Sequence, residues 1–268
     1  MLDSNRIHFV DKWIKDDVTD KAFRNHLFLR VTSKGRTFRD VGFTYSIFDR
    51  CYFRDCNFVN CDFTGAQFTS VNFHGAKFDN CKFEYTSFEK TNITSDILNN
   101  SSPGWENVAL VFARSLRVNF HGIGDVEGVN RAIQCELDAT RIHLLKTWRS
   151  RDRYYRKNYQ GMRRISYFLK WLRFELGDFL WGNGESILKL GRTIVFFIIF
   201  ASILHTMFLG RPNALSSYWD AFLILIPAFF GITHSTDYPD LILAFLYFAR
   251  LVLIGLLMTI VVKRLSRR

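Results

Sequence analysis

Phenylalanine returns at every fifth position through much of the first third of the chain. Neither an α-helix, with about 3.6 residues per turn, nor a β-strand, with a repeat of about two, keeps a five-residue phase. The pattern predicts a coil in which each side takes five residues and points its central side chain inward. The central positions are Phe38, Phe43, Phe48, Phe53, Phe58, Phe63, Phe68, Phe73, Phe78, Phe83, Phe88 and Ile93.

A second periodic position supports this coil. The residue two places before each central position is small in every repeat after the first, as in Val41, Ser46 and Cys51. A narrow interior has room for one bulky side chain per side, so its inward neighbour must be small. Residues 36–95 resemble the pentapeptide-repeat family, in which leucine is the usual central residue. The resemblance implies a right-handed quadrilateral β-helix of three coils, with residues 1–35 as an N-terminal cap.

The cysteines and the charges of the repeat limit its chemistry. Cys51, Cys56, Cys61 and Cys81 fall at the small inward positions, and a spacing of five fits no common zinc motif. We therefore interpret them as core thiols and expect no metal and no cofactor. Some soluble members of the family mimic DNA, which requires an acidic surface. Residues 36–95 carry seven basic and seven acidic side chains, so DNA mimicry is not supported.

Residues 96–190 are predicted to form a helical, basic linker. Apolar spacing after Pro103 and after Asp125 predicts a helical hairpin packed on the open end of the coil. Residues 141–173 carry a net charge of +10, close to the +11 of the whole chain, and are rich in aromatic residues. This composition fits RNA binding or a juxtamembrane segment on anionic headgroups. The apolar segments that follow favour the membrane, so no nucleic-acid partner is expected.

Two long apolar segments lie near the end of the chain. Residues 193–210 contain no charge, and residues 241–262 contain only Arg250. Each is long enough to cross a bilayer core of about 30 Å. Both outer flanks are basic, whereas residues 211–240 carry one arginine against three aspartates. The positive-inside rule and the absence of a secretory signal predict a multi-pass protein of the bacterial inner membrane with both termini in the cytoplasm.

A third apolar segment, 221–232, is too short to span and predicts a re-entrant helix, and the run from Ser217 to Asp220 before it matches a capping box that predicts the start of that helix. The order of helix, re-entrant helix, extended turn and helix over residues 191–268 resembles the pore domain of two-transmembrane potassium-channel-like proteins. The resemblance implies a filter in the run after the short helix and a hinge at Gly255. The filter candidates are Gly231, Ile232, Thr233, His234, Ser235, Thr236 and Asp237.

Two departures from that family bear on ion choice. Thr233 and Ser235 stand where the potassium filter carries glycines that turn carbonyls onto the ion, so strict potassium selectivity is not expected. Arg250 is costly in mid-span and needs a partner. Two interpretations remain open. Arg250 either faces the pore as a gating or anion-favouring residue, or packs on the carbonyl end of the re-entrant helix.

The sequence therefore predicts a tetrameric ion channel of low potassium selectivity, regulated by a cytoplasmic repeat domain and suited to depolarising a membrane in stress or defence. One chain with two spans cannot enclose a pore, so homotetramers are expected. Expected partners are membrane lipids, permeant ions and a cytoplasmic protein of unknown identity. The alternative is a non-conducting, membrane-tethered interaction scaffold. We find no nucleophile with a positioned base and no phosphate-binding glycine loop, so an enzyme is not predicted.

Overall fold

The computed structural model describes residues 6–232 and 240–266. The chain divides into two compact units, Met1–Phe168 and Leu169–Arg268, which are described separately below. The first contains a β-solenoid followed by helices, and the second is entirely helical over the residues described.

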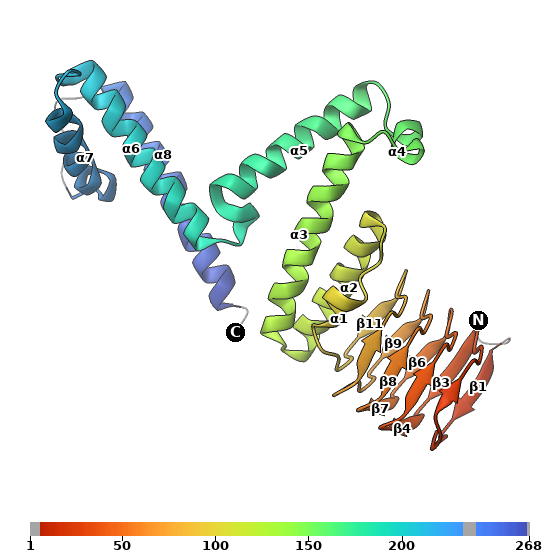
Figure 1. Ribbon diagram of the computed structural model, residues 1–268. Helices are drawn as coiled ribbons and strands as arrows, with labels where there is room; N and C mark the ends of the chain where they lie inside the picture. Colours follow the sequence, from red (N-terminus) through yellow and green to blue (C-terminus); the bar gives the residue numbers. More distant parts are fainter. Residues whose placement is uncertain (1–5, 233–239, 267–268) are drawn as a thin grey trace. The chain divides into compact units, whose positions relative to one another are not determined.

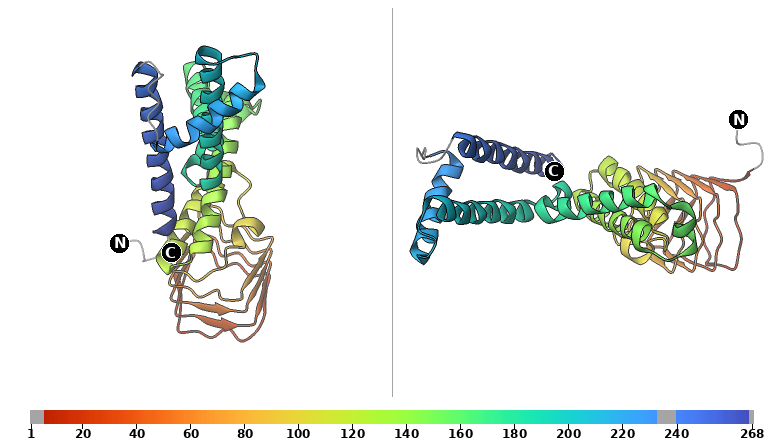
Figure 2. Two further views of the ribbon diagram at one scale, coloured as in Figure 1. Left: turned by 90° about the vertical axis from the view of Figure 1, so that its left-hand side faces the viewer. Right: turned by 90° about the horizontal axis from the view of Figure 1, so that it is seen from above.

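The β-solenoid consists of short parallel strands stacked in successive coils (Figures 1 and 2). The strands form ladders of five, four and two members, and isolated bridges complete the remaining stretches. From β2 onward the partners of consecutive coils lie twenty residues apart, as in Phe38 opposite Phe58 and Phe48 opposite Phe68, whereas β1 and β3 pair at a spacing of nineteen. The strands are β1 (Ile7–Val10), β2 (Val18–Thr19), β3 (His26–Leu29), β4 (Thr32–Lys34), β5 (Thr37–Arg39), β6 (Ile47–Asp49), β7 (Tyr52–Arg54), β8 (Asn57–Val59), β9 (Gln67–Thr69), β10 (Lys77–Asp79) and β11 (Ser87–Glu89).

The phenylalanines fill the interior in stacked columns, as their period predicts. The rings of Phe38 and Phe58 lie 4.9 Å apart between centroids, and those of Phe58 and Phe78 lie 5.1 Å apart. Rings on adjacent sides meet edge to face, which is a favourable aromatic geometry. The core is therefore almost wholly aromatic, with the small residues between the columns.

The cysteines of the repeat occupy the inward positions predicted for them. Cys51, Cys56, Cys61 and Cys81 are all buried, and each thiol donates a hydrogen bond within the coil, such as Cys51 Sγ to Phe28 O at 3.2 Å. Burial raises the pKa of Cys51 to about 11. These thiols are packing groups of the solenoid interior.

Every fifth residue also turns a corner. The second residue after a central position adopts a left-handed backbone conformation, as at Asp40, Tyr45 and Gly65. Non-glycine residues adopt positive φ infrequently, and Asn and Asp tolerate it best. Side chains link successive corners along one edge, where Asn80 Nδ2 donates to Asn60 Oδ1 at 2.8 Å and Asn60 Nδ2 donates to Asp40 Oδ1 at 3.0 Å.

The solenoid begins earlier than the sequence predicts. Residues 7–34, assigned above to an N-terminal cap, form strands β1 to β4 of the same ladders. Phe23 and Phe28 keep the five-residue phase. Ser33 occupies the next central position, so the run of phenylalanines is interrupted between Phe28 and Phe38. The solenoid has about four turns, which corrects the predicted three.

Helices close the C-terminal end of the solenoid, as the sequence predicts. The helices are α1 (Ile97–Asn100), α2 (Glu106–Ile123) and α3 (Val126–Arg149). Phe112 of α2 packs on Phe88, the last phenylalanine of the coil. Asn119 of α2 accepts a hydrogen bond from Thr91 N at 2.7 Å and donates one to Thr91 O at 2.8 Å. It thereby satisfies the backbone groups that a further coil would otherwise pair.

The hairpin of α2 and α3 turns at Gly124 and Asp125. Gly124 ends α2 with a φ of 76°, and Asp125 caps α3 by accepting a hydrogen bond from Gly128 N at 2.9 Å. Two further helices follow, α4 (Arg153–Asn158) and α5 (Met162–Trp181), and α5 continues into the second unit.

The second unit is built from the end of α5, the 3₁₀ turn η1 (Gly182–Gly184), α6 (Ile187–Leu209), α7 (Leu215–Phe230) and α8 (Asp240–Leu265). A small apolar cluster of Ile198, Leu225 and Phe229 joins α6 to α7, and Leu253 of α8 packs against it. Most large apolar side chains of α6 and α8 remain exposed in the single chain.

Candidate functional site

Two helices of the second unit are long and apolar enough to cross a membrane. The stretches are Ile187–Phe208 in α6 and Ala244–Leu265 in α8, each 22 residues long. Only 17% of the most apolar part of α6 and 6% of that of α8 is buried within the chain. Such helices would expose a large apolar surface to water, and a bilayer or other copies of the chain would cover it.

Between these two helices lies α7, which is apolar but short. Its 16 residues give a length of about 24 Å, less than the roughly 30 Å of a bilayer core. The helix starts at Leu215, two residues before the Ser217 that the sequence analysis took as its capping residue. Pro227 lies inside the helix, and Gly231 ends it with a φ of 77°.

Polar groups join α6 to α7 at their buried contact. Thr206 is fully buried, and its hydroxyl donates to Ser202 O at 3.0 Å and to Ser217 O at 3.3 Å. The second bond reaches a carbonyl in the first turn of α7 and so links the two helices. Sequence reasoning missed Thr206 and Ser202, although two small hydroxyl residues one turn apart in an apolar helix are a recognised packing signal.

The end of α7 meets the one charge inside the apolar part of α8. The guanidinium of Arg250 lies against Gly231, so that a Cβ atom at position 231 would be 2.7 Å from Arg250 Cζ. The last carbonyls of a helix carry partial negative charge, which a cation offsets. In the single chain the arginine lies beside the residue that ends the short helix, and the two interpretations of Arg250 both stay predictions.

The structure describes only part of the predicted filter. Gly231 ends α7, and Ile232 follows it with its side chain 76% exposed. The candidates Thr233, His234, Ser235, Thr236 and Asp237 lie outside the described residues. Gly255 lies within α8 with no other atom near the place where a Cβ would be. Gly231 and Arg250 are thus brought together, and Gly255 is not part of that contact.

A second polar group in the first unit involves Glu106, at the start of α2. Its carboxylate accepts a hydrogen bond from Lys146 Nζ and one from Tyr155 Oη at 3.2 Å. Burial raises the pKa of Glu106, but the hydrogen bonds outweigh it and leave that pKa below its ordinary value. These two hydrogen bonds tie Lys146 of α3 and Tyr155 of α4 to the start of α2, which is a structural role.

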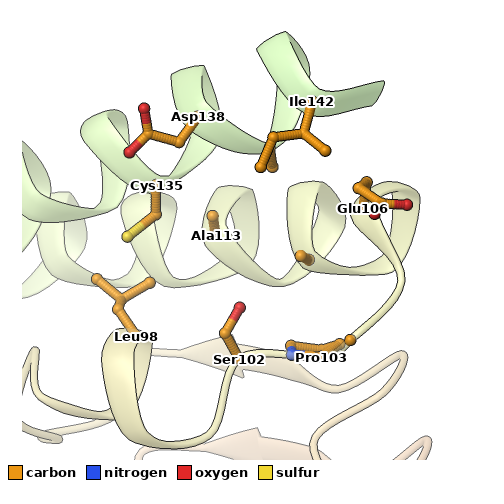
Figure 3. Close-up of a pocket in the computed structure, with 11 residues that line it drawn as sticks. Leu98, Ser102, Pro103, Glu106, Ala113, Cys135, Asp138 and Ile142 are labelled. Carbon is orange, nitrogen blue, oxygen red and sulfur yellow. The ribbon is translucent and has the colours of Figure 1, made fainter. Parts of the chain in front are cut away.

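A small hollow of about 270 Å³ lies beside Glu106, between α1, α2 and α3 (Figure 3). Cys135 and Asp138 lie on its α3 side, and Leu98 lies on its α1 side. Burial raises the pKa of the Cys135 thiol, so it is a weak nucleophile. Since Glu106 is engaged by Lys146 and Tyr155, the hollow offers no arrangement of reactive groups, and we assign it no chemistry.

Comparison with known proteins identifies the repeats. Residues 46–84 match the model for pentapeptide repeats in eight copies. No curated protein matches the chain. Two solved structures of trypsin-treated QnrB1, a plasmid-mediated fluoroquinolone resistance protein, are similar at 20% and 16% identity. They cover 33% and 34% of this chain, with TM-scores of 0.18 and 0.14. The chain spans 53% and 62% of the length of those two chains. The chain therefore carries pentapeptide repeats in a β-solenoid.

Proposed function

We propose that the protein is a homotetrameric ion channel of the bacterial inner membrane, with low selectivity for potassium and with its solenoid and both termini in the cytoplasm. In this proposal α6 and α8 span the bilayer, and α7 enters from the outer face and returns. Four copies surround a shared aqueous path, because two spans and one short helix cannot enclose one alone.

The observation that carries the proposal is the character of α7. It is apolar from Ala221 to its end, too short to cross, and packed by Ala221, Leu225 and Phe229 against its neighbours. A short apolar helix between two apolar helices of spanning length is typical of a re-entrant element. Irregular backbone at that depth is tolerated only where protein covers it or where it lines a water-filled cavity, which favours a pore after Gly231.

Arg250 supports weak potassium selectivity in this proposal. A pore helix that ends near the ion path attracts cations through the negative end of its dipole. Arg250 lies against that end in α7 and offsets the charge. The glycine-free run from Ile232 to Asp237 lacks the residues that permit a potassium filter. The two features together favour a poorly selective path that would dissipate a membrane potential.

The solenoid is the regulatory part in this proposal. We take its coils to be right-handed and quadrilateral, since five residues per side and twenty per turn give four sides. A cytoplasmic protein that binds this surface would bias the spans through the helices that follow it.

The alternative is a membrane-tethered scaffold that does not conduct. The solenoid favours this alternative, because its stacked coils present a wide surface for a partner. A scaffold also does not require that α7 enter the membrane. The two proposals differ in where α7 lies. In the scaffold it rests on the outer surface, whereas in the channel it dips into the bilayer.

Cysteine labelling of α7 in sealed vesicles tests the proposal. Single cysteines at Ser216, Leu223 and Phe230 of the full chain are reacted with a membrane-impermeant maleimide from the outer side. The channel predicts reaction at 216, protection at 223, and reaction at 230 from the same side through the pore. Reaction at all three positions would place α7 in water, and reaction at 230 only from the inner side would make it a crossing helix. Either result would overturn the proposal.

The mass of the detergent-solubilised particle tests the stoichiometry. A particle of four chains is expected, after subtraction of bound detergent. A monomer of the correctly folded chain would leave only the tethered solenoid, because one copy cannot form the path.

A further inference from the structure

We infer that α5 is a docking helix for an anionic lipid surface, held at the membrane face by the start of α6. The inference uses an apolar stripe on α5, the charges around it and its attachment to α6. It rests on the membrane insertion of α6 proposed above, but it does not require that the protein conduct ions.

The stripe runs the full length of α5. Apolar residues recur at alternating steps of three and four, which places them on one face of a helix. These residues are between 38% and 81% exposed, so the described chain leaves a large part of each uncovered. A contiguous exposed apolar face of this kind marks an interaction surface. The stripe consists of Met162, Ile165, Leu169, Leu172, Leu176 and Phe179.

The first half of α5 and the segment before it are basic, whereas the second half also carries Glu175 and Asp178. Arg163 and Arg173 of α5 are exposed, and neither makes an ion pair with a carboxylate in the described part of the chain. The same is true of Arg153, Arg156 and Lys157 in α4, which directly precedes α5. A helix with an apolar face and many cations lies in a membrane interface, and each cation near an anionic leaflet adds to its affinity.

The C-terminal end of α5 is fastened to the first turns of α6. Lys189 Nζ forms an ion pair with Asp178 at 2.7 Å, and Thr193 Oγ1 donates to Leu180 O at 2.6 Å. The guanidinium of Arg192 lies over the ring of Phe179, 4.4 Å from its centroid. These contacts fix α5 beside the point where the apolar part of α6 begins. If α6 spans a bilayer, the end of α5 therefore lies at its cytoplasmic face.

The turn between the two helices allows this attachment. Gly182, Asn183 and Gly184 all have positive φ angles, so the chain changes direction between α5 and α6 within three residues. At Gly182 a Cβ atom would lie 2.7 Å from Ser186 Cβ, so a larger residue would separate the two helices. Lys189 Nζ and Asp178 could then not meet.

A second copy of the chain is the other candidate for the stripe, because its spacing is also that of a coiled coil. Two features favour lipid. Beside the stripe only Arg173 and Glu175 carry opposite charges, whereas coiled-coil helices pair such residues along their whole length, and the charge of α4 and of the start of α5 is strongly basic. Helices that each carry several unpaired cations repel one another, whereas an anionic leaflet attracts them all.

The test uses nitroxide labels on the full chain in vesicles of phosphatidylcholine with phosphatidylglycerol. Labels are placed at Leu172→Cys, in the stripe, and at Lys170→Cys, on the other side of the helix, with Cys135→Ala as background. The four other cysteines are buried in the solenoid. Collisions with oxygen, which concentrates in lipid, and with a nickel chelate, which stays in water, are measured. We expect a several-fold higher ratio of oxygen to nickel collisions at 172 than at 170.

A charge variant shows whether anionic lipid is the partner. Arg163→Gln with Arg173→Gln should weaken docking roughly fivefold for each charge removed, and phosphatidylcholine alone should weaken it for the unchanged helix. The pair Lys77→Gln and Lys82→Gln, on the exposed surface of the solenoid, is the matched control and should have no effect.

Three results would overturn the inference. A label at 172 that collides freely with nickel would place the stripe in water. A label at 172 that is shielded from both reagents would indicate a second copy or another part of the chain. Immobilisation at 170 by single-stranded RNA in neutral vesicles would assign the cations to nucleic acid. Ion flux is measured independently in the same vesicles. Docking of α5 without ion flux would reject only the channel. Ion flux with the stripe of α5 exposed to water would reject only the docking helix.

Discussion

The guanidinium group of Arg250 occupies the space beside Gly231 that any larger residue would need. This contact joins the residue that directly follows α7 to the middle of α8, and two constraints therefore act on position 231. The backbone of Gly231 has a φ of 77°, and the arginine blocks a side chain there. Both constraints should be visible in variants.

Gly231→Ala should destabilise the second unit. An alanine with positive φ costs about 1 kcal/mol, and its methyl group would in addition displace Arg250 from the end of α7. The measurement is the thermal unfolding midpoint of the full chain in detergent. Gly255→Ala is the matched control, because that glycine is helical and has open space around it, so its replacement should be neutral or slightly stabilising. Equal effects of the two variants would reject the contact.

Arg250→Gln should increase the permeability of cations relative to anions, because it removes the charge that offsets the end of α7. Arg250→Lys keeps the charge and should change the ratio less. The ratio is taken from reversal potentials under unequal salt concentrations. Identical ratios for the two variants and the unchanged chain would show that Arg250 does not act on permeating ions.

Gly255→Ala should alter channel opening while leaving stability intact. The glycine lies inside α8, and alanine lowers the flexibility of a helix at such a point. Open probability in single-channel records is the measurement. An unchanged open probability would remove Gly255 as a hinge.

Asn119→Ala should destabilise the solenoid by about 1–3 kcal/mol, because it leaves the buried N–H and C=O of Thr91 without partners. The free energy of unfolding from denaturant titration, followed by circular dichroism in the β region, is the measurement. Asn92→Ala, at an exposed position of the same coil, should change it by less than about 0.5 kcal/mol. A loss of similar size in both would contradict the capping role of Asn119.

Acid should weaken the attachment of α4 to the helical hairpin. The folded-state pKa of Glu106 lies below the ordinary value of 4.5, so its contribution is complete above that value and is lost as the pH falls through the folded pKa. Glu106→Gln should lower the free energy of unfolding at neutral pH, and this free energy should then fall less steeply as the pH is lowered. Glu84→Gln, on the solenoid surface, is the control. If the free energy of unfolding fell equally steeply with pH in Glu106→Gln, the loss of stability in acid would come from other carboxylates.

The solenoid follows from the sequence because one rule repeats. A central phenylalanine and a small inward neighbour recur without a gap, so the register of twenty between Phe38, Phe58 and Phe78 follows from the period alone. The N-terminal extension was missed because Ser33 replaces a phenylalanine at a central position. Its burial depends on the neighbouring coils, which a local pattern does not reveal.

The helical unit was predicted less completely, since its contacts are not periodic. Apolar length identified α6 and α8, and their bounds in the structure begin or end a few residues from the predicted ones. The start of α7 was misplaced, because Ser217 resembles a capping residue but lies inside the helix. The contact of Arg250 with Gly231 joins residues 19 apart, and a sequence alone left it as one of two alternatives.

The exposed stripe of α5 was also not recognised from the sequence. The sequence contains its residues, but Tyr167, Trp171 and Phe174 on the same helix are also apolar, so the helical period of the stripe does not stand out. Burial separates the two sets, since these aromatic residues are half-buried while Leu169 and Leu172 are exposed. Which apolar face is free is a property of the packed chain.

Ion flux across vesicles that contain the purified full chain tests the central claim most directly. The channel predicts current for both small cations and small anions, with a conductance that changes in Arg250→Gln and a protein that remains folded by circular dichroism. An absence of current in every ionic condition, with the protein folded and inserted in the bilayer, would contradict the account.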